Sequence, residues 1–211
     1  MVDRELLAVL EESRRLGFLG PGPVEAHVAH AAAFLPLLPA EGRLVDLGSG
    51  GGLPGLVLAR ARPALEVVLL DAHQRRTAFL VDALDRLDLA TRAVVVADRA
   101  EVVGRSVDHR GAAACVVARS FGPPPVTAEC AAPLLALGGR LIVSEPPASE
   151  VGDRWPPDGL AEVGMTVAQV VDGPPRLVVL TQEQPCPDRF PRRTGIPAKR
   201  PLWTTAAASS G

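Results

Sequence analysis

The feature that most limits the fold of this chain is a regular alternation of short apolar runs with helical stretches, which begins at Arg43. The short runs are rich in Val and Leu and are typical of strands; they cover residues 43–47, 65–71, 92–98, 112–120 and 138–145. The helical stretches between them cover residues 54–62, 73–89 and 124–137. Strands that alternate with such helices form a mainly parallel, doubly wound sheet, because each parallel connection needs a crossover.

The last two apolar runs, residues 165–171 and 175–183, depart from this alternation. The turn sequence DGPP joins them and is too short for a crossover helix, so we expect an antiparallel hairpin. Five parallel units with a terminal hairpin resemble a class I methyltransferase, whereas a dinucleotide dehydrogenase more often continues with parallel units or a second domain. We therefore predict an α/β fold with a Rossmann-like doubly wound sheet, mainly parallel, with a C-terminal antiparallel hairpin.

Two helical stretches, residues 3–16 and 24–38, precede the first expected strand. The pattern therefore divides the chain into three parts. We expect an N-terminal helical extension at residues 1–40, a methyltransferase domain at residues 41–184 and a basic C-terminal tail at residues 185–211.

Positive charge is concentrated in this tail, although the whole chain carries a net charge of only −2. Five cations against Asp188 give residues 185–203 a charge of +4, which leaves −6 for the first 184 residues. A basic segment on an acidic body is expected where a protein meets a polyanion such as RNA; a solvated, disordered end is the alternative. The candidate RNA-binding residues are Arg189, Arg192, Arg193, Lys199 and Arg200.

Composition excludes several other classes of protein. Hydrophobic residues make up 47% of the chain and charged residues 22%, which is typical of a globular domain with a full core. Cys115, Cys130 and Cys186 form no CxxC pair, and their odd number argues against a disulfide framework; we expect no metal site. No apolar stretch reaches transmembrane length and no signal peptide opens the chain, so we expect a cytoplasmic protein without a membrane partner.

The stretch DLGSGGGLPG, residues 46–55, follows the first expected strand, where a doubly wound sheet binds its ligand. Its glycines allow a sharp turn and a close approach of the backbone, and the next helix begins near Pro54. A GxGxxG pattern fails in the register that starts at Gly48 and is only degenerate from Gly50. An acid two residues before the first glycine favours S-adenosylmethionine, because its amino and sulfonium groups are cationic. The candidate cofactor residues here are Asp46, Gly48, Ser49, Gly50, Gly52, Leu53 and Pro54.

Asp71 and Ala72 follow the second expected strand, about twenty residues beyond the glycine loop. An acidic side chain at this place accepts hydrogen bonds from ribose hydroxyls, so Asp71 favours a nucleoside cofactor without choosing among such cofactors. The alternative is that Asp71 caps the next helix.

The sequence ADRAE, residues 97–101, follows the third expected strand. The backbone N–H groups of Ala100 and Glu101 are positioned for an adenine edge, and Asp98 for its exocyclic amine. A capping box from Asp98 to Glu101 is the alternative, and both interpretations are compatible.

Arg119 and Phe121 end the fourth expected strand, where this class of fold places the methyl group and its acceptor. We interpret Arg119 as the catalytic residue that positions an anionic or nucleobase acceptor, and also as a cofactor contact. Phe121 offers a stacking face, with packing as the alternative.

Together these motifs resemble the bacterial 16S ribosomal RNA guanine-N7 methyltransferase family, also called RsmG or GidB. The glycine loop of that family is typically DLGSGAGxPG, close to residues 46–55. Its second strand ends in LLD, as at residues 69–71, and its third is followed by a RAE-like signature, as at residues 99–101. Its SRAF motif resembles ARSF at residues 118–121, and the YPRKxGxPxKxPL-like tail of its Gram-positive members resembles FPRRTGIPAKRPL at residues 190–202.

The chain also departs from the family pattern. It has a shorter N-terminus without the WN…NLT segment, and His30 stands where an Asp or Asn usually follows the histidine matched by His27. Ser144 or Glu145 replaces a lysine that usually follows the fifth strand. A divergent paralogue that keeps the cofactor site and has a changed acceptor is therefore an alternative.

The resemblance implies transfer of a methyl group from S-adenosylmethionine to guanine N7 in small-subunit ribosomal RNA or the ribosomal particle. Guanine N7 has a lone pair and no proton to lose, so we expect no general base, and we expect a monomer. Removal of residues 186–211 should lower RNA affinity and leave cofactor binding intact. The alternatives are a methyltransferase of the same fold acting on a small molecule or another RNA, and a non-catalytic, cofactor-binding, ribosome-associated protein.

Overall fold

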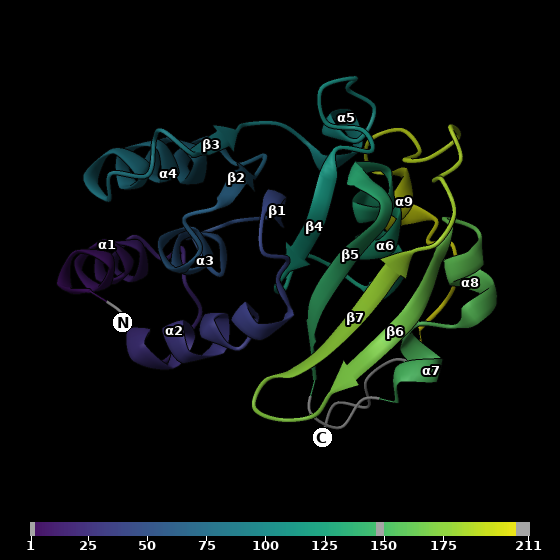
Figure 1. Ribbon diagram of the computed structural model, residues 1–211, viewed down its shortest axis with the longest axis horizontal. Helices are drawn as coiled ribbons and strands as arrows, with labels where there is room; N and C mark the ends of the chain where they lie inside the picture. The colour runs from purple at the N-terminus through teal and green to yellow at the C-terminus, as the bar shows by residue number, and fades with distance from the viewer. Residues whose placement is uncertain (1–2, 147–149, 206–211) are drawn as a thin grey trace.

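The computed structural model describes residues 3–146 and 150–205; residues 206–211, at the end of the expected tail, lie outside this range. A seven-stranded sheet in the order β3-β2-β1-β4-β5-β7-β6 forms its centre (Figure 1). The strands are β1 (Gly42–Leu47), β2 (Leu65–Leu70), β3 (Ala93–Val96), β4 (Ala113–Ala118), β5 (Leu135–Glu145), β6 (Met165–Val171) and β7 (Arg176–Gln182).

The pairing of these strands confirms the predicted fold class. β1 pairs in parallel with β2 and β4, β2 with β3, and β4 with β5. The last two strands form the predicted antiparallel hairpin, and β7 also pairs antiparallel with β5. The strand order reverses at β1, between β2 and β4, so the loops after these strands meet at one edge of the sheet.

Helices cover both faces of the sheet. The helices are α1 (Arg4–Arg15), α2 (Val24–Ala32), α3 (Gly55–Ala61), α4 (Gln74–Arg86), α5 (Ala100–Val103), α6 (Pro124–Ala131), α7 (Val151–Arg154), α8 (Pro157–Ala161) and α9 (Ile196–Lys199). One hydrophobic cluster contains residues of α1, α2, α3 and α4 and of one face of the sheet. A second cluster contains residues of α5, α6 and α8 and of the opposite face. Neighbouring residues of β1 divide between the two: Leu44 belongs to the first cluster and Val45 to the second, as the alternation of side chains along a strand requires.

Two helices end earlier than predicted. The helix expected at residues 124–137 stops at Ala131, a short 3-10 turn covers Ala132–Leu134, and β5 already begins at Leu135. Pro133 lies in this turn, and a proline inside a helix removes a hydrogen bond and clashes with the preceding turn. The helix expected at residues 24–38 likewise ends at Ala32 before a 3-10 turn over Leu35–Leu37, which contains Pro36.

The N-terminal helix contacts the glycine loop directly. The Ser13 hydroxyl, which is buried, donates to the Gly51 carbonyl at 2.8 Å. A β-carbon at Gly51 would lie 2.4 Å from that hydroxyl oxygen and 2.8 Å from the Phe18 carbonyl. The loop therefore needs glycine at position 51 because the N-terminal segment packs tightly over it.

The described part of the C-terminal tail, residues 185–205, is called the C-terminal segment below. It packs on the main domain beside α5 and α6 (Figure 1). Phe190 is only 2% exposed. The Arg110 guanidinium donates to the carbonyls of Phe190 at 2.7 Å and Cys186 at 2.9 Å, which fixes the start of the segment. The described part of the tail is therefore packed on the domain, which differs from the alternative interpretation of a solvated, disordered end.

Among the described helices, none has the length and apolar character to cross a membrane. The same residues contain no cluster of side chains suited to hold a metal ion.

Candidate functional site

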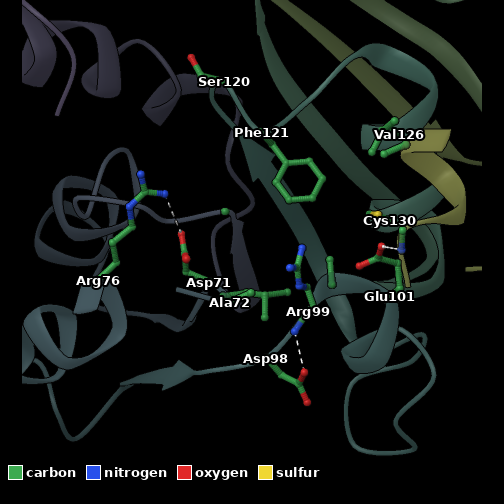
Figure 2. A pocket seen from close by; sticks show the side chains of 15 residues that line it. Asp71, Ala72, Arg76, Asp98, Arg99, Glu101, Ser120, Phe121, Val126 and Cys130 are labelled. Atoms are coloured by element: carbon green, nitrogen blue, oxygen red, sulfur yellow. Dashed lines mark hydrogen bonds and ion pairs between the residues drawn. The ribbon is translucent and has the colours of Figure 1, made fainter. Parts of the chain in front are cut away.

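Three adjoining cavities lie where β1, β2 and β4 end. The central cavity, of about 330 Å³, lies between the β2 and β3 loops and the C-terminal segment (Figure 2). The loop cavity, of about 270 Å³, lies under the glycine loop and the turn at residues 18–20. The outer cavity, of about 290 Å³, lies between the ends of β4 and β5 and the end of α7. Ser120 lines all three cavities, so they adjoin one another around the end of β4.

Ser120 connects the cavities through an unusual backbone conformation. Its φ angle is +55°, which a residue with a side chain adopts only at a cost of about 1 kcal/mol or more. The turn directs Phe121 into the central cavity (Figure 2), and the same residue also lines the outer cavity.

Gly48 provides the floor for the Phe121 ring. Its φ angle is +76°, and a β-carbon there would lie 2.6 Å from the Phe121 Cδ2 atom. The backbone N–H groups of Gly48 and Ser49 both donate to the Leu70 carbonyl, at 2.8 and 3.0 Å, which ties the loop to the end of β2. Of the predicted loop residues, Gly48, Ser49, Gly50 and Leu53 line the cavities, whereas Gly52 and Pro54 do not.

Asp46 lies beneath the loop and lines none of the three cavities. It is buried, and its Oδ2 atom accepts a hydrogen bond from the Gly55 N–H at 2.9 Å. Burial raises the pKa of Asp46 to about 7, against the hydrogen bonds from Gly55 and Ser49. In the structure Asp46 thus holds the start of α3 under the loop, and its contact with the cationic cofactor stays a prediction.

Asp71 lies in the wall of the central cavity, as predicted, together with Ala72. Its Oδ2 atom accepts from the Gly50 N–H at 2.8 Å, and its Oδ1 atom accepts from the His73 N–H at 2.8 Å. The residue that caps α4 is His73, so Asp71 is not the N-cap that the alternative required. Sequence reasoning missed Arg76, which lies 3.9 Å from Asp71 and lines both the central and the loop cavity (Figure 2).

The loop after β3 forms the opposite wall of the central cavity, with Asp98, Ala100 and Glu101. α5 begins at Ala100 with Arg99 as its N-cap, and Asp98 accepts from the Arg99 N–H at 2.7 Å. The expected capping box is therefore absent from this loop. Glu101 instead accepts from the N–H of Gly195, at 2.9 Å from its Oε1 atom.

Arg119 faces the loop cavity and is absent from the lining of the outer one. Its Nη2 atom lies 2.7 Å from the His27 Nδ1 atom, and the His27 Nε2 atom lies 3.1 Å from the Gly20 carbonyl. This geometry fits a His27 tautomer whose Nε2 donates a hydrogen bond to Gly20 and whose Nδ1 accepts a hydrogen bond from Arg119. The Arg119 Nη1 atom is buried with no hydrogen-bond partner among the described residues. Burial lowers the pKa of Arg119, and the nearby Asp46 opposes this shift.

The outer cavity contains a buried ion pair that sequence reasoning missed. The Glu145 carboxylate accepts from the Arg154 Nε atom and, at 3.1 Å, from the Trp155 indole N–H. Glu145 is buried, and Arg154 lies on α7 at the cavity wall. The departure from the family pattern at Ser144 and Glu145 was the available signal, but no local pattern pairs Glu145 with a residue nine positions away.

The C-terminal segment contributes to the central cavity through Gly195 and Ala198, which were not predicted. Arg192, predicted to bind RNA, has a partner within the chain. Its side chain and backbone N–H bind the Glu129 carboxylate, which is fully buried on α6. The other four predicted cations are exposed: Arg189, Arg193, Lys199 and Arg200.

Comparison with known proteins gives a consistent result over most of the chain. The family model described as rRNA small subunit methyltransferase G matches residues 23–146. Ribosomal RNA small subunit methyltransferase G of Rubrobacter xylanophilus is 35% identical, over 94% of this chain and 85% of that protein. The protein of the same name from Deinococcus radiodurans is 37% identical, over 82% of this chain and 71% of that protein.

Solved structures of low sequence identity share the fold. A putative O-methyltransferase from Klebsiella pneumoniae superposes with a TM-score of 0.61 at 17% identity, covering 86% of this chain and 90% of that chain. A SAM-dependent O-methyltransferase from Thermotoga maritima gives a TM-score of 0.54 at 15% identity, covering 82% of this chain and 71% of that chain. The class I methyltransferase architecture predicted from the strand pattern is thus confirmed.

Proposed function

Because this chain belongs to the rRNA small subunit methyltransferase G family, we propose that it methylates N7 of a guanine in small-subunit ribosomal RNA. The chain is a methyltransferase, and its methyl donor is S-adenosylmethionine. The observation that carries the proposal is the arrangement of three adjoining cavities around Ser120, two of which share Phe121, so that a donor and an acceptor can lie on the two sides of Phe121.

We assign the nucleoside of the donor to the central cavity. Asp71 supports this assignment because its carboxylate, held by two backbone N–H groups, retains lone pairs for the ribose hydroxyls. The opposite wall, at Asp98 to Glu101, is then the place of the adenine edge, with the backbone N–H groups and Asp98 as its partners.

We assign the amino-acid end of the donor to the loop cavity. Arg119 supports this step, since its guanidinium is held by His27 and has one buried nitrogen without a partner among the described residues. A carboxylate matches a guanidinium in charge and geometry. Of the two roles expected for Arg119 from the sequence, this proposal therefore keeps the contact with the donor and not the positioning of the acceptor.

The acceptor base then enters the outer cavity, with Phe121 as its stacking surface. Stacking on an aromatic ring is a common way to hold an unstacked RNA base. N7 of guanine is a nucleophile with a free lone pair, so catalysis consists of aligning N7 with the methyl–sulfur bond in a site that excludes water. The Arg154–Glu145 pair supplies fixed polar groups for the edge of the base.

Methyl transfer from labelled S-adenosylmethionine tests the proposal, with small-subunit particles, naked small-subunit RNA, transfer RNA and a metabolite set as acceptors. The expected product is N7-methylguanosine in the small-subunit RNA, identified by mass mapping. Label only in transfer RNA or metabolites would refute the substrate assignment. Calorimetry with S-adenosylmethionine and S-adenosylhomocysteine is the first control, since a chain that binds neither is not a methyltransferase.

A further inference from the structure

A shallow groove lies on the outer side of the central cavity, between α5 and the C-terminal segment. This α5 groove, of about 420 Å³, is lined by Glu101, Val102, Arg105, Arg193 and Thr194. Glu101 also lines the central cavity, so the two spaces adjoin at this residue. Its Oε1 atom accepts from the Gly195 N–H at 2.9 Å, directly beside the groove residues of the segment.

Two arginines from different elements line the α5 groove. Arg105 follows α5, and Arg193 belongs to the C-terminal segment; both are exposed. One Arg105 nitrogen lies 3.4 Å from the Arg189 carbonyl, which leaves the rest of this planar group for an anion. Glu101 opposes an anion here by its charge, but its carboxylate is already engaged with Gly195.

The same segment forms a wall of the central cavity through Gly195 and Ala198. An anion bound between Arg105 and Arg193 would bridge α5 and the segment, and would thereby hold Gly195 on Glu101. A ligand that stabilises the docked segment stabilises the cavity wall in the same step. By linkage, whatever fills the central cavity also strengthens the anion site.

We propose that the α5 groove binds a phosphate of the RNA backbone and couples RNA binding to cofactor binding through Glu101 and Gly195. The proposal rests on the proposed function, because it takes the polyanion to be the RNA substrate. Arginine is suited to this contact, since its planar fork matches phosphate oxygens. The proposal thus adds Arg105 to the cations that contact RNA, and it omits Arg192 because this side chain binds Glu129.

The test compares the full chain with the double variant R105Q/R193Q and with a control, R4Q/R15Q. The control removes the same charge from two exposed arginines at the ends of α1, which lies away from the groove (Figure 1). RNA affinity is measured over a salt series with naked small-subunit RNA. The affinity for S-adenosylhomocysteine, which cannot react, is measured by calorimetry with and without that RNA.

For the wild type and the control, we expect RNA to tighten S-adenosylhomocysteine binding by about five-fold or more, as typical coupling between sites predicts. For R105Q/R193Q, we expect RNA binding to weaken by about ten-fold and the salt slope to fall by about 1.5–2. Without RNA, this variant should bind S-adenosylhomocysteine as the wild type does, and addition of RNA should produce no gain.

Three results would overturn the proposal. The first is equal RNA affinity in R105Q/R193Q and the wild type, and the second is an RNA-induced gain of the same size in both. The third is the same gain with inorganic phosphate in place of RNA, which would make the groove an ion site. A wild type that methylates small-subunit RNA while R105Q/R193Q shows no defect refutes this inference alone, whereas a wild type that methylates no RNA refutes the proposed function.

Discussion

The buried pair between Glu129 and Arg192 yields a quantitative prediction. Glu129 is 0% exposed and accepts three hydrogen bonds from Arg192: from the backbone N–H at 2.8 Å, from Nε at 2.8 Å and from Nη2 at 2.5 Å. The substitution Arg192→Met keeps the backbone donor and an unbranched apolar side chain but removes both guanidinium contacts. A buried carboxylate then remains without its counter-charge.

Loss of one partner from a buried ion pair costs about 3–5 kcal/mol, whereas an exposed pair contributes about 0–1 kcal/mol. The lower end applies here, because the backbone N–H of residue 192 still binds Glu129. We therefore expect R192M to lower the free energy of unfolding by about 3 kcal/mol. For a chain of this size, that corresponds to a fall in Tm of about 6–12 °C.

Urea unfolding followed by circular dichroism measures this change, with E129L/R192M as the matched control. The double variant removes the buried charge together with its partner, so it should recover about half or more of the lost stability. A loss below about 1 kcal/mol in R192M would show that the pair behaves as an exposed one, and the reasoning from burial would be refuted.

Three further predictions follow from the site. Gly48→Ala should weaken S-adenosylmethionine binding in calorimetry by about ten-fold. The added β-carbon would lie 2.6 Å from the Phe121 ring and displace it, and the φ angle of +76° is strained for alanine. Unchanged affinity would contradict the close contact between Gly48 and Phe121. Deletion of residues 186–211 should weaken cofactor binding as well as RNA binding, contrary to the expectation from sequence, because Gly195 lines the central cavity; intact cofactor affinity would exclude that wall from the site. Burial, with nearby Arg119 and His27, lowers the pKa of His30 from 6.5 to about 4, so the unfolded chain binds more protons between these values and the contribution of His30 to stability is lost as the pH falls from 6.5 to 4. The stability difference between the wild type and His30→Gln, measured by urea unfolding at several pH values, should therefore shrink over that range, and a constant difference would refute the assignment.

The sheet could be predicted from the sequence because its strands are buried on both faces and are separated by amphipathic helices. Leu44 and Val45 belong to opposite clusters, and such runs leave a clear apolar signal. The antiparallel hairpin of β6 and β7 could also be predicted, because the turn DGPP is too short for a crossover helix. The early end of the helix at Ala131 was missed because the apolar pattern continues through Pro133 into β5.

The candidate site was predictable only where its residues follow strands directly. Asp71 and the loop at Asp98 to Glu101 lie where the fold places ligand contacts, and the structure puts them in one cavity. The contacts of Glu101 with Gly195 and of Glu129 with Arg192 join residues far apart in the chain, and no local pattern indicates them. The position of Asp46 beneath the loop likewise depends on its bond to Gly55, which the sequence did not indicate.

Segments near both ends of the described chain line the loop cavity and the central cavity. The turn at residues 18–20 lines the loop cavity, and Gly195 and Ala198 line the central one. During translation, the proposed cofactor site is therefore incomplete until residues 192–198 have left the ribosome and docked on α5 and α6. Products of premature termination before this point have the glycine loop and Asp71 but lack one wall of the cavity.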